Sequence, residues 1–451
     1  MEKIIKVEII SRDIVKPSSP TPTHLKNYNL CLLDQFYPEF HCGIILFYSS
    51  PQTNHHKNDN QNYCRTLKNS LADTLTDFYP IAGRFKDTSS IDCNDQGACV
   101  VQAKINSSLS NFLGGLSQPS CSNNVQKNLK MFIPSLDSIT MESASSSILI
   151  AQLTEFECGG IAICFSLMHR FCDLASVVVF LKSWSARSRG ESGEITVPDF
   201  SASSLLPPQD LPPLPAIDKP IENRTTRRLV FEASKISDLK KKFTDENKSA
   251  KIESISRVEV VFALILKCAI SAARSIDKLK NKKSAFLHAV NLRKRTTPPL
   301  PENSMGNLIW GIPVEIEGEI EFQEIVNKIR YETTSFYNET VRRIKGDEEG
   351  TTLIFESMNK QGEIIKTTGD LDFYYSSSWC RFPFYDIDFG WGKPVWVSSG
   401  IMSPENLIVI EDSKCGNGIQ AWVTLDPKVM EIYQLDEELL SFASFNSNIL
   451  A

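Results

Sequence analysis

The chain has 451 residues, of which 41% are hydrophobic and 23% charged, and 48 Lys and Arg against 54 Asp and Glu give a formal net charge of −6. This length allows two or three domains with cores of their own, which excludes a single small binding module. The dense basic stretch at 278–283 is interpreted as a solvated loop or helix end. Because phosphates and anionic lipids require clustered Lys and Arg, we expect neither nucleic acid nor a membrane as a partner.

The N-terminus, the apolar segments and the cysteines bear on the compartment. Residues 1–15 alternate charged and apolar side chains and lack the apolar core of a secretory signal. The longest apolar window, 258–273, contains Glu259 and Lys267 and falls short of the roughly 18 residues of a membrane span. Twelve cysteines are spread along the chain without a C-x-x-C pair. We therefore expect a soluble cytoplasmic protein with free thiols and no metal site.

The first half of the chain mixes strand and helix patterns. Alternating or continuous apolar runs predict strands at 41–50, 145–156 and 161–168, the last two joined by a tight Glu-Cys-Gly-Gly connection. Helical spacing predicts helices at 67–79 and 174–188. The polar stretch 49–63 is interpreted as a surface loop.

Proline marks the main boundary of the chain. Seven of the 23 prolines lie between Pro198 and Pro220, where missing amides and fixed φ angles exclude a regular helix or central strand. We predict a crossover linker at 187–224 between an N-terminal domain, 1–186, and a C-terminal domain, 225–451.

The second half of the chain again contains both kinds of element. Its patterns predict a buried helix at 256–276, a strand at 284–293, and a hairpin at 406–425 that turns on Asn417-Gly418. Elements of both kinds in each half predict an α/β fold with mixed sheets.

His169 has a setting unlike that of the other five histidines. It follows the predicted strand 161–168, and Asp173 stands at the start of the next predicted helix. Ligand crevices open at strand ends in α/β layers, so an imidazole there is well placed to meet a substrate. The alternative is that Asp173 caps the helix and His169 fills the junction. The H-x-x-x-D spacing alone leaves both interpretations open.

Several further motifs add to H-x-x-x-D. In chain order they are Ile14–Pro22, Leu33-Asp34-Gln35, Tyr79–Arg84, Phe156–Gly160, His169-x-x-x-Asp173, Asn291-Leu292-Arg293, Gly306-Asn307 and Asp388-Phe389-Gly390-Trp391-Gly392. In this order and at these separations they resemble the BAHD family of plant acyl-CoA-dependent acyltransferases, and within it the group that acetylates alkaloids. The resemblance covers nearly the whole chain. It implies a two-domain fold like that of chloramphenicol acetyltransferase, with a channel at the domain interface.

The resemblance also implies roles for particular residues. His169 would be the general base that activates an acceptor alcohol, and acyl-CoA would be a co-substrate rather than a tightly bound cofactor. Asp173 would pair with Arg293, in preference to completing a triad with His169. Ser377 and Trp379 match the oxyanion donors of the hydroxycinnamoyltransferase branch, although Trp379 is equally interpreted as a packed aromatic.

The remaining motifs are expected either to support the structure of the site or to contact CoA. Asp388 and Trp391 of the DFGWG motif are expected to be structural. The surfaces that match the family's CoA contacts are Ser254, Ser256, Arg257, Gly306 and Asn307.

The chain departs from the family pattern at three places. Met168 and Arg170 flank the histidine in place of the usual His or Ser and Lys, and Leu174 follows the aspartate where Gly is common. The bulk of Leu174 favours a small acyl group. Ile364 stands where the shikimate-using branch has an arginine, which argues against a shikimate or quinate acceptor.

Three hypotheses follow for the activity. The first is a monomeric cytoplasmic O-acetyltransferase that uses acetyl-CoA and acylates a hydroxyl of a plant specialised metabolite, an alkaloid in particular. The second is transfer of a malonyl, aliphatic or aromatic group, or acylation of an amine. The third is a catalytically silent paralogue that binds metabolites.

Overall fold

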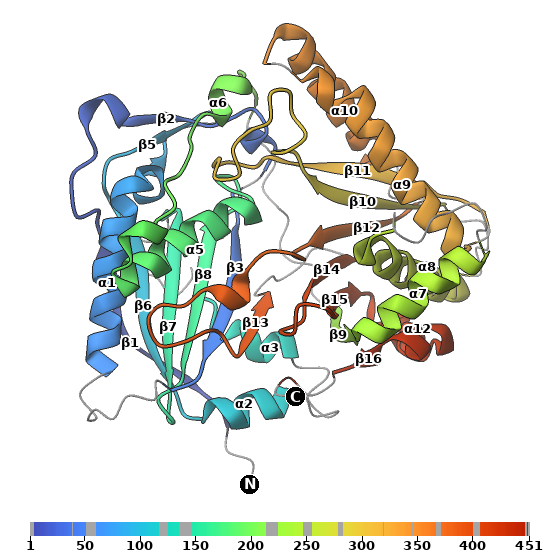
Figure 1. Cartoon of the computed structure of the whole chain (residues 1–451), viewed down its shortest axis with the longest axis horizontal. Coiled ribbons are helices and arrows are strands. Elements are labelled where there is room, and N and C mark those ends of the chain that lie inside the picture. The colour runs from blue at the N-terminus through green and yellow to red at the C-terminus, as the bar shows by residue number, and fades with distance from the viewer. Residues whose placement is uncertain are drawn as a thin grey trace.

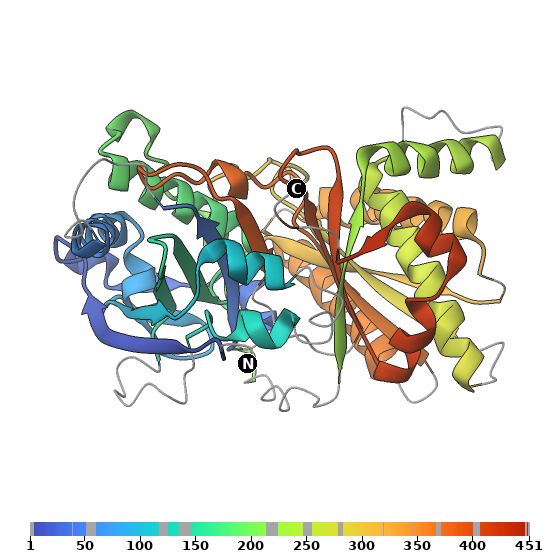
Figure 2. The same ribbon diagram turned by 90° about the horizontal axis from the view of Figure 1, so that it is seen from below.

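The computed structural model describes most of the chain. The described residues are 4–37, 39–50, 60–116, 125–134, 146–212, 224–246, 255–277, 283–318, 320–344, 346–366, 371–399, 406–446 and 449. His55, His56, Ser254 and most of the basic stretch at 278–283 lie outside them. The chain forms two lobes side by side, each built on its own large sheet (Figures 1 and 2).

The first lobe contains a six-stranded mixed sheet in the order β1-β6-β7-β8-β3-β13. Its strands are β1 (Val7–Val15), β3 (His41–Tyr48), β6 (Ala98–Ile105), β7 (Leu149–Phe156), β8 (Ile161–Met168) and β13 (Trp396–Ser399). Neighbouring strands run antiparallel except β6 and β7. A small sheet lies beside it, made of β2 (Asn27–Asn29), β4 (Arg84–Phe85) and β5 (Ser90–Asp92).

The second lobe contains a seven-stranded mixed sheet in the order β11-β10-β12-β14-β15-β9-β16. Its strands are β9 (Thr225–Phe231), β10 (Lys283–Asn291), β11 (Ile309–Ile316), β12 (Leu371–Ser378), β14 (Leu407–Asp412), β15 (Ile419–Leu425) and β16 (Ser444–Phe445). The parallel pairs are β10 with β12 and β12 with β14. Both lobes therefore have the mixed sheets that the sequence predicted.

Helices cover the sheets of both lobes. Those of the first lobe and the crossover are α1 (Asn60–Asp77), α2 (Leu109–Leu116), α3 (Val125–Lys130), α5 (Leu174–Arg189) and α6 (Ala202–Leu205). Those of the second lobe are α7 (Ala233–Glu246), α8 (Arg257–Asp277), α9 (Phe322–Glu339), α10 (Glu348–Lys366), α11 (Pro427–Tyr433) and α12 (Glu437–Phe442). Helices α7, α8 and α12 lie on the side of the second sheet that faces away from the first lobe (Figure 2). No helix among the described residues is long and apolar enough to cross a membrane.

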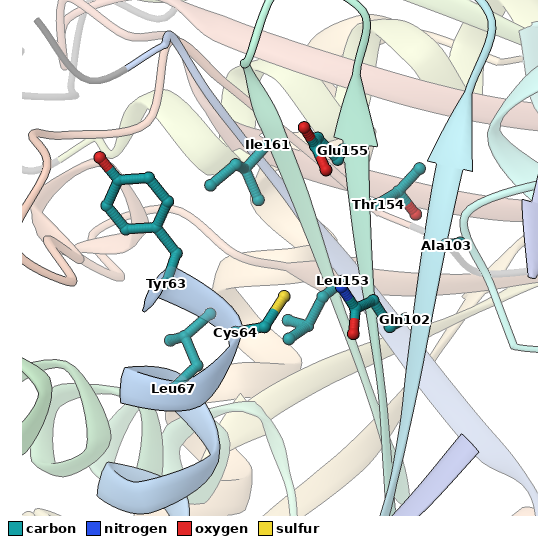
Figure 3. A pocket seen from close by; sticks show the side chains of 9 residues that line it. All are labelled: Tyr63, Cys64, Leu67, Gln102, Ala103, Leu153, Thr154, Glu155 and Ile161. Atoms are coloured by element: carbon teal, nitrogen blue, oxygen red, sulfur yellow. The ribbon is translucent and has the colours of Figure 1, made fainter. Parts of the chain in front are cut away.

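Helices α1 and α5 pack together in the first lobe, where the Trp184 indole donates to the carbonyl of Leu67 at 3.1 Å. A gap of about 20 Å³ remains between α1 and the sheet, beside Cys64 and Leu153 (Figure 3). It is about the size of a single water molecule. This gap is therefore too small to receive an organic substrate.

The two lobes exchange one segment of chain. After β12 the chain leaves the second lobe, crosses the first, and adds β13 to the exposed edge of β3 (Figures 1 and 2). The amide of Val395 donates to the carbonyl of Phe47 at 2.7 Å, and the Tyr48 hydroxyl donates to the carbonyl of Ile387 at 2.9 Å. We call residues 379–399 the strap. The division predicted at 187–224 did not include this exchange. It assigned the strap to the C-terminal domain, because the strap follows the linker in sequence, whereas the strap lies in the first lobe.

The predicted hairpin at 406–425 forms with a different turn. Strands β14 and β15 pair from Ile408 with Val423 to Asp412 with Ile419, which leaves a six-residue loop at 413–418. Gly416 has φ 75°, and its amide donates to the carbonyl of Ser413 at 2.7 Å. The prediction of a two-residue turn on Asn417-Gly418 was therefore wrong. The loop is longer, and the glycine with a positive φ is Gly416 rather than Gly418.

Candidate active site

A cavity of about 130 Å³ opens between the two lobes. The first lobe contributes β3, the end of β8 and the start of α5, the second contributes β10, β11 and β12, and the start of the strap completes the lining. Its walls are mostly apolar, and the lining residues are Cys42, Ile44, Leu167, His169, Cys172, Asp173, Leu174, Ala175, Val177, Ala289, Val290, Asn291, Ile309, Ser377, Ser378, Trp379 and Phe382. His169, Asp173, Ser377 and Trp379, which the sequence analysis selected separately, thus meet in one cavity.

The backbone and ring of His169 are both held in place. Its amide, directly after β8, donates to the carbonyl of Phe40 at 2.8 Å, and its Nδ1 lies 3.0 Å from Oδ1 of Asn307. The Tyr37 ring stacks on the imidazole, with ring centroids 4.6 Å apart and planes 2° from parallel. Burial lowers the pKa of His169 below its usual 6.5 because the charged form is poorly solvated. The imidazole is therefore neutral at neutral pH.

Asp173 faces Arg293 and not His169. The Arg293 guanidinium donates to Oδ2 of Asp173 at 2.7 Å and to Oδ1 at 2.9 Å, and both side chains are buried. The Asp173 carboxylate also accepts the amide of Ser176 at 2.9 Å, which caps α5, and the amide of Leu308 at 3.1 Å. Asp173 thus has the arginine partner that the resemblance implied and the capping role that was its alternative. The pair joins α5 of the first lobe to the segment after β10.

Gly306 and Asn307, predicted as CoA contacts, are both buried beside the cavity. The Asn307 side chain is completely buried, and its amide nitrogen donates to the carbonyl of His169 at 2.7 Å and to Oδ1 of Asp34 at 3.0 Å. The Gly306 carbonyl accepts the Ser176 hydroxyl at 3.0 Å. Burial raises the pKa of Asp34 to about 6, and the hydrogen bonds donated to its carboxylate oppose that shift. In the sequence Asp34 and Asn307 stand only as parts of motifs, and neither their contact with each other nor that of Asn307 with His169 was predicted.

Ser377 and Trp379 lie on the strand end that faces the cavity. The indole N–H of Trp379 donates to Oγ of Ser377 at 3.0 Å, and the Trp379 side chain is 4% exposed. The Ser377 oxygen accepts from the indole, so its own hydrogen can be donated to a group in the cavity. Trp379 is thus packed in the core with its N–H donated to Ser377, and its role as an oxyanion donor stays a prediction.

Ser256 and Arg257 lie at the N-terminus of α8, outside the lining of the cavity. Ser256 and Glu259 form a capping box, in which the Glu259 amide donates to Oγ of Ser256 at 3.1 Å and the Ser256 amide to the Glu259 carboxylate at 2.7 Å. The Arg257 guanidinium donates to Asp412 at 2.6 Å and to the carbonyl of Gly416 at 2.7 Å. Both predicted CoA contacts therefore already have partners within the protein.

The DFGWG motif shapes the strap. Oδ1 of Asp388 accepts the amides of Gly390 at 2.7 Å and Gly392 at 2.9 Å, and both glycines have φ angles near 106–108° that favour glycine. The Trp391 ring packs on Tyr63, Tyr48 and Phe389. The motif lies outside the cavity lining. Among the described residues, no group of three or more His, Cys, Asp or Glu side chains is placed to hold a metal ion.

A model of the Transferase family, the acyltransferase family with the BAHD motifs, matches residues 5–440. The chain belongs to the BAHD family. It is 37% identical to akuammiline synthase 1 of Alstonia scholaris, an alignment that covers 97% of this chain and 98% of the relative. It is 34% identical to limonoid 7-O-acetyltransferase of Citrus sinensis, with the same coverage of both chains.

The crystal structure of vinorine synthase gives the same fold. It superposes with a TM-score of 0.81 at 32% identity and covers 99% of this chain and 100% of that one. The protein is therefore a BAHD acyltransferase with the two-domain fold of that family, as the motifs implied.

Proposed function

We propose that this BAHD protein transfers an acetyl group from acetyl-CoA to a hydroxyl of a plant specialised metabolite, with His169 as general base. The observation that carries the proposal is the position of the His169 imidazole in the cavity between the lobes, with Nδ1 held 3.0 Å from Asn307. That contact leaves Nε2 as the basic nitrogen. A general base whose pKa lies near the working pH contributes roughly 10²–10⁴-fold to the rate.

His169 and Ser377 each have a separate part in the proposed acyl transfer. Nε2 of His169 takes the hydroxyl proton of the acceptor while its oxygen attacks the thioester carbonyl carbon. The Ser377 hydroxyl, polarised by the Trp379 indole at 3.0 Å, donates to the oxyanion of the tetrahedral intermediate. The C–S bond then breaks, and His169 returns its proton to the CoA thiolate. Both substrates occupy the cavity together, so no covalent acyl-enzyme forms.

Leu174 supports the choice of acetyl as the transferred group. It lines the cavity directly after Asp173, at the N-terminus of α5 beside His169. A glycine there would open space that the leucine side chain fills. Malonyl or aromatic groups would have to displace this side chain.

The mostly apolar walls of the cavity favour an acceptor with an apolar skeleton. Among its lining residues the only ionisable side chains apart from cysteines are His169 and Asp173, and Asp173 is paired with Arg293. The relatives include acetyltransferases of limonoids and of alkaloids, and we place the acceptor among such polycyclic alcohols, alkaloids first. N-acylation is the second candidate, because an amine could use the same base.

Purified protein incubated with acetyl-CoA and a library of alkaloid and limonoid alcohols tests the proposal. We expect a product heavier by one acetyl group, equimolar thiol release, and no turnover by His169→Ala; the exposed His24→Ala is the control. Near-full turnover by His169→Ala contradicts the general base. Binding of CoA without thiol release from any acyl-CoA, acceptor or amine would favour the silent paralogue.

We also propose that the protein works as a cytoplasmic monomer. The residues to which the proposal gives a role in the chemistry, His169, Ser377 and Trp379, lie together in the cavity of one chain. Light scattering gives the mass in solution, and a dimer whose dissociation abolishes turnover would contradict the monomer. A fluorescent fusion that localises to an organelle would contradict the compartment.

A further inference from the structure

Asp34 is a buried carboxylate that the proposed chemistry does not use. It begins a 3₁₀ turn (Asp34–Phe36) of the first lobe and is fully buried. Its Oδ1 accepts the backbone amide of Asn307 at 2.6 Å and the side-chain amide of Asn307 at 3.0 Å, and its Oδ2 accepts the amide of Cys31 at 2.8 Å. A carboxylate of one lobe thus holds an amide that enters the site from the other.

These contacts decide which way the Asn307 amide points. Its two N–H groups face two oxygens, Oδ1 of Asp34 and the carbonyl of His169, and each of these can only accept. Reversing the amide would set its oxygen against both acceptors. The Asn307 oxygen must therefore face Nδ1 of His169, 3.0 Å away. Nδ1 must then carry the proton, and Nε2 has the free lone pair that a base needs.

We propose that Asp34 is a positioning residue that fixes the catalytic tautomer of His169 through the side chain of Asn307. The inference rests on the proposed function, in which Nε2 of His169 is the base. It gives Asn307 a role beside the CoA contact that the resemblance implied.

The Asn307 amide lies between Asp34 and His169, so the Asp34 carboxylate can orient the imidazole without bonding to it directly. In a Ser-His-Asp triad the carboxylate bonds directly to the imidazole and stabilises its charged form. Here Asp34 reaches His169 only through a neutral amide, and Asp173 is already engaged by Arg293. The imidazole is held in one tautomer without a directly bonded carboxylate to raise its pKa. This suits a buried histidine that must be neutral before each turnover.

The ¹⁵N chemical shifts of the imidazole report the tautomer and need no acceptor. Protein labelled with ¹⁵N-histidine contains six histidines, and His169→Gln assigns the one of interest. We expect Nδ1–H in the wild type. In Asp34→Asn the new amide can donate to the oxygen of Asn307 and reverse it, so the population shifts towards Nε2–H.

Two further variants separate positioning from general support of the fold. Asn307→Asp sets a second carboxyl against Asp34, and the two share a proton. The oxygen that faces Nδ1 accepts and should keep Nδ1–H, whereas Asn307→Leu should lose the preference. Gln35→Leu is the matched control: Gln35 adjoins Asp34 on the same turn and bonds to Gln209 rather than Asn307. If Asp34→Asn does not fold, the contrast between Asn307→Asp and Asn307→Leu still decides whether the side chain at 307 fixes the tautomer of His169.

Turnover supplies the second measurement, with the acceptor found in the library. Asp34→Asn should lower kcat by about 10²-fold, within the range of a general base, and leave the KM for acetyl-CoA close to wild type. An inactive His169→Ala together with wild-type shifts and turnover in Asp34→Asn overturns only this inference. Equal ¹⁵N shifts in Asn307→Asp and Asn307→Leu would also overturn it. An active His169→Ala overturns the proposed function itself.

Discussion

Influences of opposite sign act on the charge of His169. Burial disfavours the imidazolium, and it outweighs the hydrogen bond to the backbone of His169 itself, the charge of Asp173 and the hydrogen bond to Asn307, which all favour that form. The Asp173 charge is largely compensated, because Arg293 binds both of its carboxylate oxygens. The result is a neutral imidazole, which is the form that can accept a proton.

The pH dependence of turnover follows from the lowered pKa of His169. The base is neutral above its pKa, so kcat/KM for the acceptor should rise with pH along a limb whose midpoint lies below 6.5 and be level by pH 7. Steady-state rates between pH 4.5 and 8 measure this limb. Asp34, whose pKa is raised to about 6, titrates in the same range, so the ¹⁵N titration of His169 is needed to give the midpoint of the imidazole itself in the free enzyme. A midpoint above 6.5 in both measurements would mean that a neighbouring charge outweighs burial.

Leu174 should set the length of the acyl group. Replacing it with alanine opens the cavity beside His169 and should raise the ratio of kcat/KM for butanoyl-CoA to that for acetyl-CoA by about 10-fold, since a methylene in an apolar pocket contributes roughly 1–3 kcal/mol. Val177→Ala, one turn further along α5 and also in the lining, is the matched control. A larger change in Val177→Ala than in Leu174→Ala would place the acyl group further along the helix.

Elements defined by local pattern were predictable, and those defined by distant partners were not. Strand β8 and helix α5 follow from apolar runs on either side of His169, so the strand end that carries the histidine was predictable. The strap was not, because β13 has four residues and exists only by pairing with β3. The contacts of Asn307 were not predictable for the same reason: its partner Asp34 lies 273 residues away.

Asp388 should stabilise the strap as an element. Its carboxylate accepts two amides in the turn, so Asp388→Ala leaves two N–H groups without that partner and should cost about 1–3 kcal/mol in the free energy of unfolding. Urea denaturation measures the loss. Asp386→Ala is the control, because that carboxylate is 63% exposed in its ion pair with Lys393 and should contribute under about 1 kcal/mol. Equal losses in the two variants would remove the special role of the motif.

The two lobes are held together by three kinds of contact that surround the cavity. The strap supplies an exchanged strand, Asp34 and Asn307 a buried hydrogen-bonded pair, and Asp173 and Arg293 a buried ion pair. All three join segments on opposite sides of the linker. The distance between the lobes therefore depends on buried polar contacts, which require defined geometry, and this preserves the shape of the cavity.

Arg293→Met tests this coupling at the scale of the whole molecule. The substitution leaves the buried Asp173 carboxylate without its cation, which should cost about 3–5 kcal/mol and separate the calorimetric transition into two, one for each lobe. Arg343→Met, which removes an ion pair with both side chains more than half exposed, should change stability by less than about 1 kcal/mol and keep one transition. The double variant Asp173→Leu/Arg293→Met removes the unpaired charge and should recover part of the loss. Recovery stays incomplete because Asp173 also caps α5 through Ser176. A double variant less stable than Arg293→Met alone would show that the cap, rather than the ion pair, is the main contribution of Asp173.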